Sequence, residues 1–254
     1  MIKQLKATLY ILKRDPKPFA ALAIHLILTF YILFDARISI LGAKSLTTVI
    51  EFFKSFTCYV LMTLPLSSVI FVNMTIGRDI ADGARKNKIA IGISRGSIFA
   101  TDFVTIGIFN LVCFAIHALV LALIFKITAP WFEFTWARIK NILPFCLMWI
   151  TAWTAFIAMI MTVFDNEIAR ISTGVIFVIA NIFMEEAFPF TYQIMDMKGI
   201  KKSLFLFLSK RIPFRFKLTS LSGVDVQTAA QATLTITILC LVMGYIAIKR
   251  KDIK

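Results

Sequence analysis

The stretch TIGRDIADGARKNKIAIGISRGSIFATDF, residues 75–103, is a polar break between two long apolar runs. The runs on either side, 55–77 and 103–125, contain no Asp, Glu, Lys or Arg. One charge near the centre of a bilayer costs about 2.5–3.5 kcal/mol, so charge-free runs of this length are typical of membrane spans. The quoted stretch is therefore expected to connect two spans and to lie outside the hydrocarbon.

The composition of the whole chain is that of an integral membrane protein. Of its 254 residues, 59% are hydrophobic and 17% are charged, whereas soluble domains carry about 25% charged residues. The 28 Lys and Arg against 14 Asp and Glu give a net charge of +14, which suits anionic lipid as well as nucleic acid. With a mean hydropathy of +0.84, we expect membrane lipids as partners and no nucleic acid.

Six apolar runs predict the membrane spans. Four are unambiguous because each exceeds the ~20 helical residues that cross a bilayer: 55–77, 103–125, 141–164 and 226–248. Two are weaker, 18–34 and 171–184, and the second is short enough for a re-entrant element. The first also follows a basic stretch, as a signal peptide does, but no clear cleavage site follows it, so we expect a span.

The distribution of basic residues predicts the orientation. Basic residues gather in the first 17 residues, in 78–95 and in 249–254, and the positive-inside rule puts all three in the cytoplasm. Only an even number of spans places both termini there, so six spans are expected. The segment 188–225 would then lie outside the cell; its basic and apolar residues are expected to form a partly buried amphipathic hairpin.

The first fifteen residues predict an amphipathic helix on the membrane surface. Ile2, Leu5, Leu9 and Leu12 recur at the three- and four-residue spacing of one helix face. The sequence RDPKP should end this helix, because proline restricts itself and the residue before it. A plain juxtamembrane anchor that contacts no partner protein is the alternative.

Three glycines divide the quoted stretch into two short pieces. Gly77, Gly83 and Gly92 bracket RDIADG and ARKNKIAI, and glycine permits sharp reversals of the chain. The second piece is expected to form a short helix held apart from the flanking spans. Its basic edge and its isoleucines would suit contact with a cytoplasmic partner, and a solvated basic loop is the alternative.

The same stretch resembles the coupling loop of ABC type-2 permeases. The resemblance rests on Gly77, Asp79, Gly83, Arg85, Lys86, Asn87, Lys88, Ile89, Gly92, Ser94, Arg95, Ile98 and Phe99. It implies an all-α integral membrane fold of the type V exporter kind. The whole chain, 1–254, would be one transmembrane domain, with six spans, an N-terminal interfacial helix (1–15) and a cytoplasmic coupling segment (78–96) between spans two and three. The expected coupling residues are Asp79, Asp82, Gly83, Arg85, Lys86, Asn87, Lys88, Ile89, Gly92, Ser94 and Arg95, with no catalytic role.

The resemblance also implies partners. No G-x-x-x-x-G-K-[ST] phosphate loop occurs in the chain, so we expect ATP and Mg on a separate ATPase subunit, present in two copies, and no cofactor or metal on this chain. A second permease copy would complete the pathway in the bacterial plasma membrane. Among similar permeases, exporters of phenol-soluble modulins or lantibiotics imply amphipathic or cationic peptide substrates. A drug or ion efflux permease and an ATP-independent immunity or scaffold protein are the alternatives.

Other chemistry-bearing residues give weaker signals. Glu185 and Glu186 follow the fifth predicted span and are either exit-gate residues or interfacial anchors. Membrane-embedded proteases also begin a motif with two glutamates, but Phe190 stands where that motif needs arginine, so no enzyme is expected. His25 and His117 lack acidic or cysteine residues at the next helical turn and are expected to be packing residues.

Overall fold

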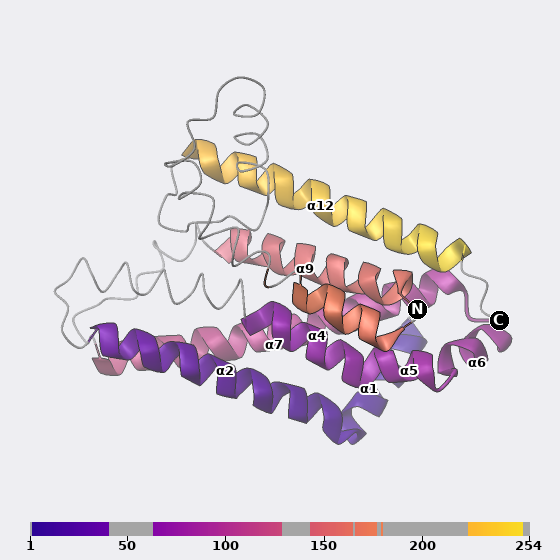
Figure 1. Cartoon of the computed structure of the whole chain (residues 1–254), viewed down its shortest axis with the longest axis horizontal. Helices are drawn as coiled ribbons and strands as arrows, with labels where there is room; N and C mark the ends of the chain where they lie inside the picture. Colours follow the sequence, from indigo (N-terminus) through magenta and orange to yellow (C-terminus); the bar gives the residue numbers. More distant parts are fainter. Residues whose placement is uncertain are drawn as a thin grey trace.

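The computed structural model describes residues 2–40, 63–128, 143–164, 166–176, 179 and 223–250. All regular structure in these residues is helical (Figure 1). The elements are α1 (Ile2–Arg14), α2 (Pro16–Ile40), α4 (Leu64–Val72), η2 (Asn73–Gly77), α5 (Arg78–Ala81), α6 (Ala84–Ala90), α7 (Arg95–Thr128), α9 (Leu143–Val163) and α12 (Gly223–Arg250). Residues 167–176 form a further helical stretch.

Three of the described helices are long and apolar enough to cross a membrane. The segments concerned are Arg95–Val120 of α7, Cys146–Val163 of α9 and Thr233–Arg250 of α12. Together they indicate a multi-pass membrane protein. The predicted spans 55–77 and 171–184 are described only in part. Almost all of the predicted outer hairpin, 188–225, lies outside the described residues.

The first two helices meet at a short break. Asp15 separates them, and its Oδ1 accepts a hydrogen bond of 3.0 Å from the backbone N–H of Lys17. Pro16 is the first residue of α2, a position where its missing N–H costs nothing. The predicted N-terminal helix and its end at RDPKP are therefore observed. The helix also packs against α2 and α7 of the same chain.

The boundary at Gly77, the first of the three glycines, differs from the prediction. Helix α4, the π-helical turn η2 and helix α5 run into one another, and Gly77 has ordinary helical angles (φ −60°, ψ −39°). Gly77 therefore does not break the chain as we expected. A Cβ there would lie 3.5 Å from Nη2 of the buried Arg170, which is an ordinary contact distance, so the packing does not require glycine at this position.

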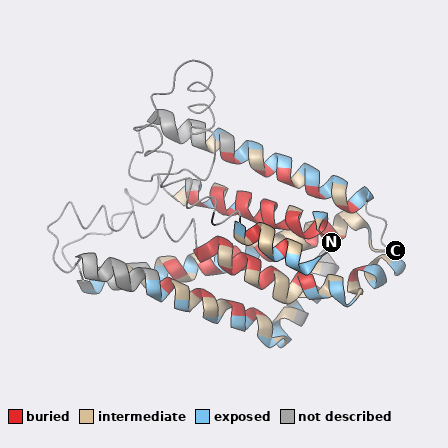
Figure 2. Cartoon of the chain, viewed as in Figure 1, coloured by how far each residue is buried: buried red, intermediate tan, exposed pale blue. Residues whose placement is uncertain are grey.

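The helices pack side by side with α9 in the interior (Figure 1). Helix α12 packs mainly on α9, α9 also contacts α7, and α2 lies against α4 and α7. Two-thirds of the α9 span is buried within the protein, compared with about a fifth of the α12 span. Figure 2 shows the same gradient, with buried residues concentrated on α9 and exposed ones on the outer side of α12. The exposed side of α12 is apolar, with Leu234, Ile238 and Met243 all more than half exposed, as a lipid-facing surface requires.

Aromatic and small residues build the core. Phe71 of α4 stacks on Phe109 of α7 with ring centroids 3.9 Å apart. On α9, Trp149, Trp153 and Phe156 contact one another in sequence and are almost fully buried. Such ring pairs add about 0.5–1.5 kcal/mol beyond the area they bury.

Candidate functional site

The predicted coupling residues lie on a compact segment at one end of the bundle. We call residues 78–94, which contain α5, α6 and the turns around α6, the connector segment. In Figure 1 this segment lies at the end of the molecule where the N- and C-termini also lie, and α6 extends past the ends of the long helices. The connector segment is thus held outside the helix bundle.

Two glycines with positive φ set the limits of α6. Gly83 (φ 71°) and Gly92 (φ 86°) are the only described residues in this conformation, which costs a residue with a side chain about 1–2 kcal/mol. At the far end, the N–H of Gly92 bonds the carbonyl of Ile89 (2.9 Å) and that of Ile93 bonds the carbonyl of Lys88 (3.0 Å). This pair of bonds is the Schellman arrangement that ends a helix. The predicted short helix between these two glycines is therefore observed.

The chain enters α7 through a side-chain cap. The hydroxyl of Ser94 accepts a hydrogen bond of 3.2 Å from the backbone N–H of Ser97, which satisfies one of the N–H groups left open at a helix start. Ser94 was predicted as a coupling residue, and its observed role is to begin α7.

Three ion pairs tie the connector segment together. Arg78 and Asp82 pair across one turn at 3.1 Å, with both side chains more than half exposed. Lys88 of α6 pairs with Asp79 of α5 at 2.7 Å. Arg85 of α6 pairs with Asp102 of α7, and these two side chains are only 10% and 14% exposed. Of these pairs, the one between Arg85 and Asp102 has the least water around it.

The eleven predicted residues differ in how accessible they are. Exposed ones are Asp82, Lys86, Asn87, Gly92 and Ser94; half-buried ones are Asp79, Gly83, Lys88, Ile89 and Arg95; Arg85 is buried. Ile89 packs against the hydrophobic core, and Arg95 donates a hydrogen bond of 2.8 Å to the carbonyl of Lys249 at the end of α12. The structure therefore places all eleven in one region but leaves only some of them free to touch a partner.

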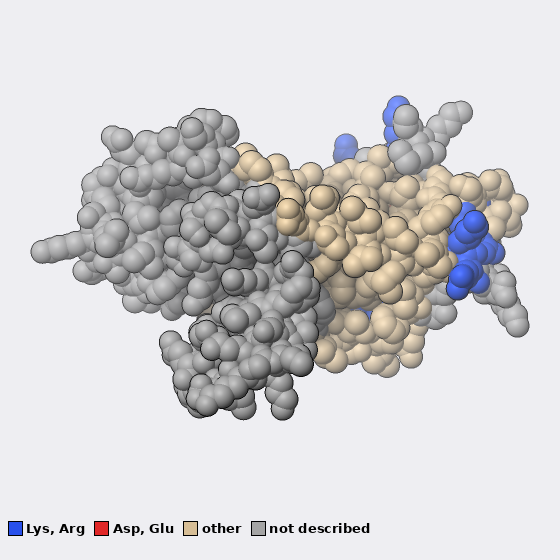
Figure 3. Space-filling view, turned by 90° about the horizontal axis from the view of Figure 1, so that it is seen from above, with Lys and Arg blue, Asp and Glu red and all other residues tan. Residues whose placement is uncertain are grey.

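The surface at this end of the molecule is basic. Figure 3 shows the largest group of lysine and arginine side chains at the end that carries the connector segment, with smaller blue patches elsewhere and most of the described middle formed by other residues. The exposed basic residues at this end include Lys86 of α6 and Lys249 and Arg250 of α12. This distribution fits a water-facing end next to an apolar, membrane-embedded middle.

One residue of the site was missed by the sequence interpretation. Asp102 was within the quoted stretch but was given no role, although it is the only charged residue in 96–125 and such a charge needs a partner. Ile91, one of the isoleucines expected to suit a partner contact, is 77% exposed directly before Gly92.

A second polar cluster lies deep in the bundle. Asn110 of α7 accepts a hydrogen bond from the Ser68 hydroxyl of α4 and donates one of 3.0 Å to Thr154 of α9. His25 of α2 has Nδ1 3.0 Å from the Ser67 hydroxyl and Nε2 3.2 Å from the carbonyl oxygen of Cys113. Four helices are therefore joined by hydrogen bonds where water is excluded.

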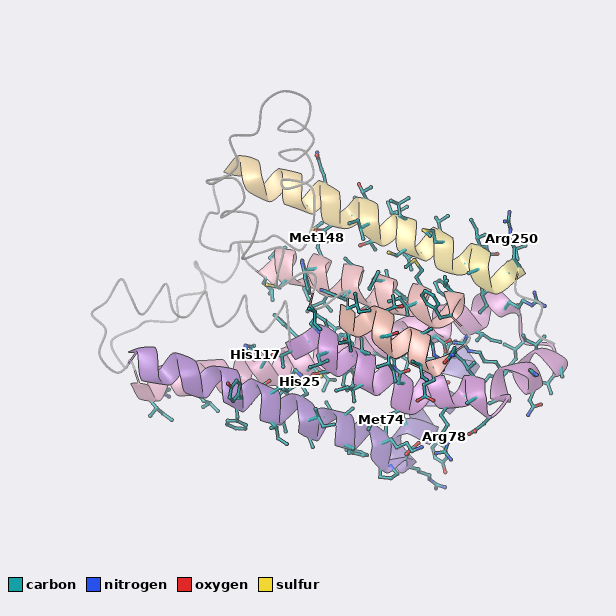
Figure 4. All side chains as sticks on the ribbon, viewed as in Figure 1. His25, Met74, Arg78, His117, Met148 and Arg250 are labelled. Atoms are coloured by element: carbon teal, nitrogen blue, oxygen red, sulfur yellow. The ribbon has the colours of Figure 1, made fainter. Side chains whose placement is uncertain are left out.

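The two histidines are fully buried, as the packing interpretation requires. Figure 4 labels His25 and His117 in the middle of the bundle, away from the end where Arg78 and Arg250 lie. Among the described residues, no group of three or more His, Cys, Asp and Glu side chains could hold a metal ion. Glu185 and Glu186, expected to be either exit-gate residues or interfacial anchors, lie outside the described residues.

The fold and these contacts define a multi-pass helical membrane protein with a short helix held at one end of its bundle. Comparison of the chain with models of known protein families and with curated protein sequences finds no match to either.

Proposed function

We propose that the chain is the membrane-spanning subunit of an ATP-driven exporter and that its connector segment docks on a separate ATPase subunit. The observation that carries the proposal is α6 itself. This helix is bounded by two left-handed glycines, lies beyond the bundle, and presents Lys86, Asn87 and Ile91 to solvent. A short, rigid, exposed helix with a basic edge is suited to insertion into a cleft on a cytoplasmic partner.

The proposal includes six spans with both termini in the cytoplasm. The charge-free run 18–34 supports α2 as a span, since its 25 residues extend about 37 Å at 1.5 Å per residue. The described parts of 55–77 and 171–184 are helical as well. Because six spans enclose little space for a pathway, two copies would act together in the bacterial plasma membrane. ATP-driven movement of the two ATPase subunits would then shift the paired bundles between inward- and outward-facing states.

The proposed substrates are amphipathic or cationic peptides of the phenol-soluble modulin or lantibiotic kind. This part of the proposal rests on the resemblance of the chain to permeases of this size that export such peptides. The 25 phenylalanines of the chain and the basic residues of the expected outer hairpin, 188–225, support it. A drug or ion efflux permease and an ATP-independent immunity or scaffold protein are the competing functions.

A site-specific cross-link tests the docking step. A photo-reactive amino acid replaces Ile91, and the chain is purified from its native membrane after illumination. We expect the product to contain a polypeptide with a G-x-x-x-x-G-K-[ST] phosphate loop, identified by mass spectrometry. The matched control is Tyr31 of α2, which is equally exposed at 77% but lies in the apolar run 18–34.

The outcomes separate the candidate functions. An ATPase cross-linked from Ile91 and not from Tyr31 supports the exporter, and Lys86→Glu should then reduce its yield. Absence of an ATPase from both products overturns the docking proposal and favours the scaffold function. ATP-dependent uptake of a labelled amphipathic peptide into inside-out vesicles then distinguishes peptide export from drug or ion efflux.

A further inference from the structure

Apolar packing alone does not hold α6 in place. The helix has only seven residues, and isolated helices shorter than about 12–15 residues are marginal in water. Of its side chains, Lys86, Asn87 and Ala90 are exposed, and Ile89 is the one that packs against the core. The position of α6 therefore depends on its polar contacts with neighbouring helices.

Two ion pairs tie α6 to two different membrane helices. Lys88 reaches Asp79 at the end of the continuous helix 64–81, and Arg85 reaches Asp102 on α7. The first pair is 25% and 47% exposed, so water screens it. The second is 10% and 14% exposed, where the attraction between charges is stronger. The tie from α6 to α7 is thus the stiffer of the two.

Beyond Asp102, helix α7 is bonded into the centre of the bundle. Asn110 lies eight residues further along, about 12 Å at 1.5 Å per residue. It bonds Ser68 of α4 and Thr154 of α9, and the adjacent Phe109 stacks on Phe71. A displacement of α7 is therefore passed directly to α4 and α9.

We propose that the Arg85–Asp102 ion pair makes α6 move as one body with α7, so that α7 is the helix through which movement of the connector segment enters the bundle. Arg85 and Asp102 are then positioning residues and do not touch the partner, although Arg85 was predicted among the docking residues. The inference rests on the proposed docking function for what moves α6, but the tie between α6 and α7 is a property of this chain alone.

The first experiment needs no partner. Amide hydrogen exchange is measured on the purified full chain in lipid nanodiscs for the wild type and for R85Q/D102N. Neutralising both side chains avoids leaving one buried charge unpaired. We expect exchange of the α6 amides to rise at least threefold while amides after Asn110 are unchanged. A rise of less than threefold in α6 overturns the tie.

The matched comparison is D79N/K88Q, which removes the more exposed ion pair of the same helix. This variant should change α6 exchange less than R85Q/D102N does. An equal or larger effect of D79N/K88Q overturns the assignment of α7 as the stiffer connection. Arg78→Gln, which removes an exposed pair outside α6, controls for a general effect of charge loss.

The second experiment uses the ATPase cross-linked from Ile91. In the wild-type complex, addition of ATP and vanadate, which traps ADP and vanadate in the ATPase after hydrolysis, should change the exchange of α7 amides between Arg95 and Asn110. In R85Q/D102N we expect the ATPase to co-elute as before while this change in α7 is lost, and the charge-exchanged variant R85D/D102R should restore it. If the ion pair had only a structural role, R85Q/D102N would show the same change in α7 exchange as the wild type. That result overturns the proposal.

Failures of the two proposals give different results. If the wild type captures no ATPase, the docking function fails, and the exchange measurements without partner still decide whether Arg85 and Asp102 tie α6 to α7. If R85Q/D102N loses the ATPase itself, the two residues belong to the docking surface and the positioning role is overturned.

Discussion

At the scale of single residues, polar side chains of this protein form two separate groups with different surroundings. Within the connector segment, Asp79 pairs with Lys88 in a partly exposed place, and Arg85 pairs with Asp102 of α7 in a more buried one. In the centre, Asn110 and Thr154 are fully or almost fully buried and bond each other. Unpaired polar atoms are costly where water is excluded, so the central contacts should matter most for stability.

Thr154 and Thr151 offer a matched test on one helix. Both donate to a carbonyl one turn earlier on α9, but Thr154 also accepts the bond from Asn110, while Thr151 is exposed. Thr154→Val removes the acceptor for the Asn110 amide and should lower the free energy of unfolding by about 1–3 kcal/mol. Thr151→Val should change it by less than about 0.5 kcal/mol. Unfolding in mixed detergent measures both, and equal effects would contradict the role given to Asn110.

The left-handed glycine that ends α6 gives a second prediction at this scale. Gly92→Ala should destabilise α6 by about 1–2 kcal/mol because alanine does not tolerate φ of 86°. Amide exchange in α6 should therefore rise roughly 5- to 30-fold. Gly107→Ala is the control, since a Cβ there would lie 3.7 Å from Thr154 Cγ2, an ordinary contact. The prediction fails if amide exchange in α6 is equally fast in Gly92→Ala and Gly107→Ala.

At the scale of elements, close contacts between helices depend on glycines as well. A Cβ on Gly244 of α12 would lie 2.7 Å from the ring of Phe99 on α7 and 3.3 Å from Met159 Cα on α9. The three helices therefore meet at a position where no side chain fits. Gly174 likewise allows the helical stretch 167–176 to approach α4 closely, because a Cβ there would lie 2.7 Å from Val69 Cγ2.

Gly244→Ala tests this packing. We expect it to lower the free energy of unfolding by about 1–3 kcal/mol, as forced overpacking does. Phe99→Leu in the same chain should recover part of the loss, because it removes the ring atoms that the new methyl group meets. Unfolding curves of the two single variants and the double variant measure the coupling. Strictly additive effects would show that the contact is not where the structure places it.

The elements that sequence interpretation predicted well are those fixed by local chemistry. The break before Pro16 follows from proline, and both limits of α6 follow from Gly83 and Gly92. The prediction of a break at Gly77 is wrong because glycine permits a reversal of the chain without requiring one, and Gly77 has ordinary helical angles. The burial of Arg85 could not be predicted for a non-local reason: it depends on Asp102, 17 residues away, and nothing in the local sequence of α6 reveals it.

At the scale of the whole molecule, the two ends of α7 should lie on opposite sides of the membrane. The helix has 34 residues, about 51 Å at 1.5 Å per residue, which exceeds the ~30 Å of a bilayer core. Ile91, just before α7, and Ile127, near its end, are 77% and 75% exposed. Because the two residues are almost equally exposed, labels at these positions can report which side of the membrane each end of α7 faces.

Labelling with a membrane-impermeant maleimide tests this arrangement. Cysteine replaces Ile91 or Ile127 in a background carrying Cys58→Ser, because Cys113, Cys146 and Cys240 are buried. In intact cells we expect labelling at position 127 only, and in inside-out vesicles at position 91 only. Labelling of both positions from the same side would contradict the six-span orientation.

The π-helical turn at Asn73–Gly77 has a consequence for how this chain tolerates changes in length. A π turn accommodates one residue more than an α-helix does, and each α-helical residue turns the chain by about 100°. Deleting one residue within the turn should leave the buried faces of α4 and α5 aligned as they are. Deleting one residue within α4 itself would rotate those faces out of phase. The turn is thus a place where this helix can gain or lose a residue without changing what either end contacts.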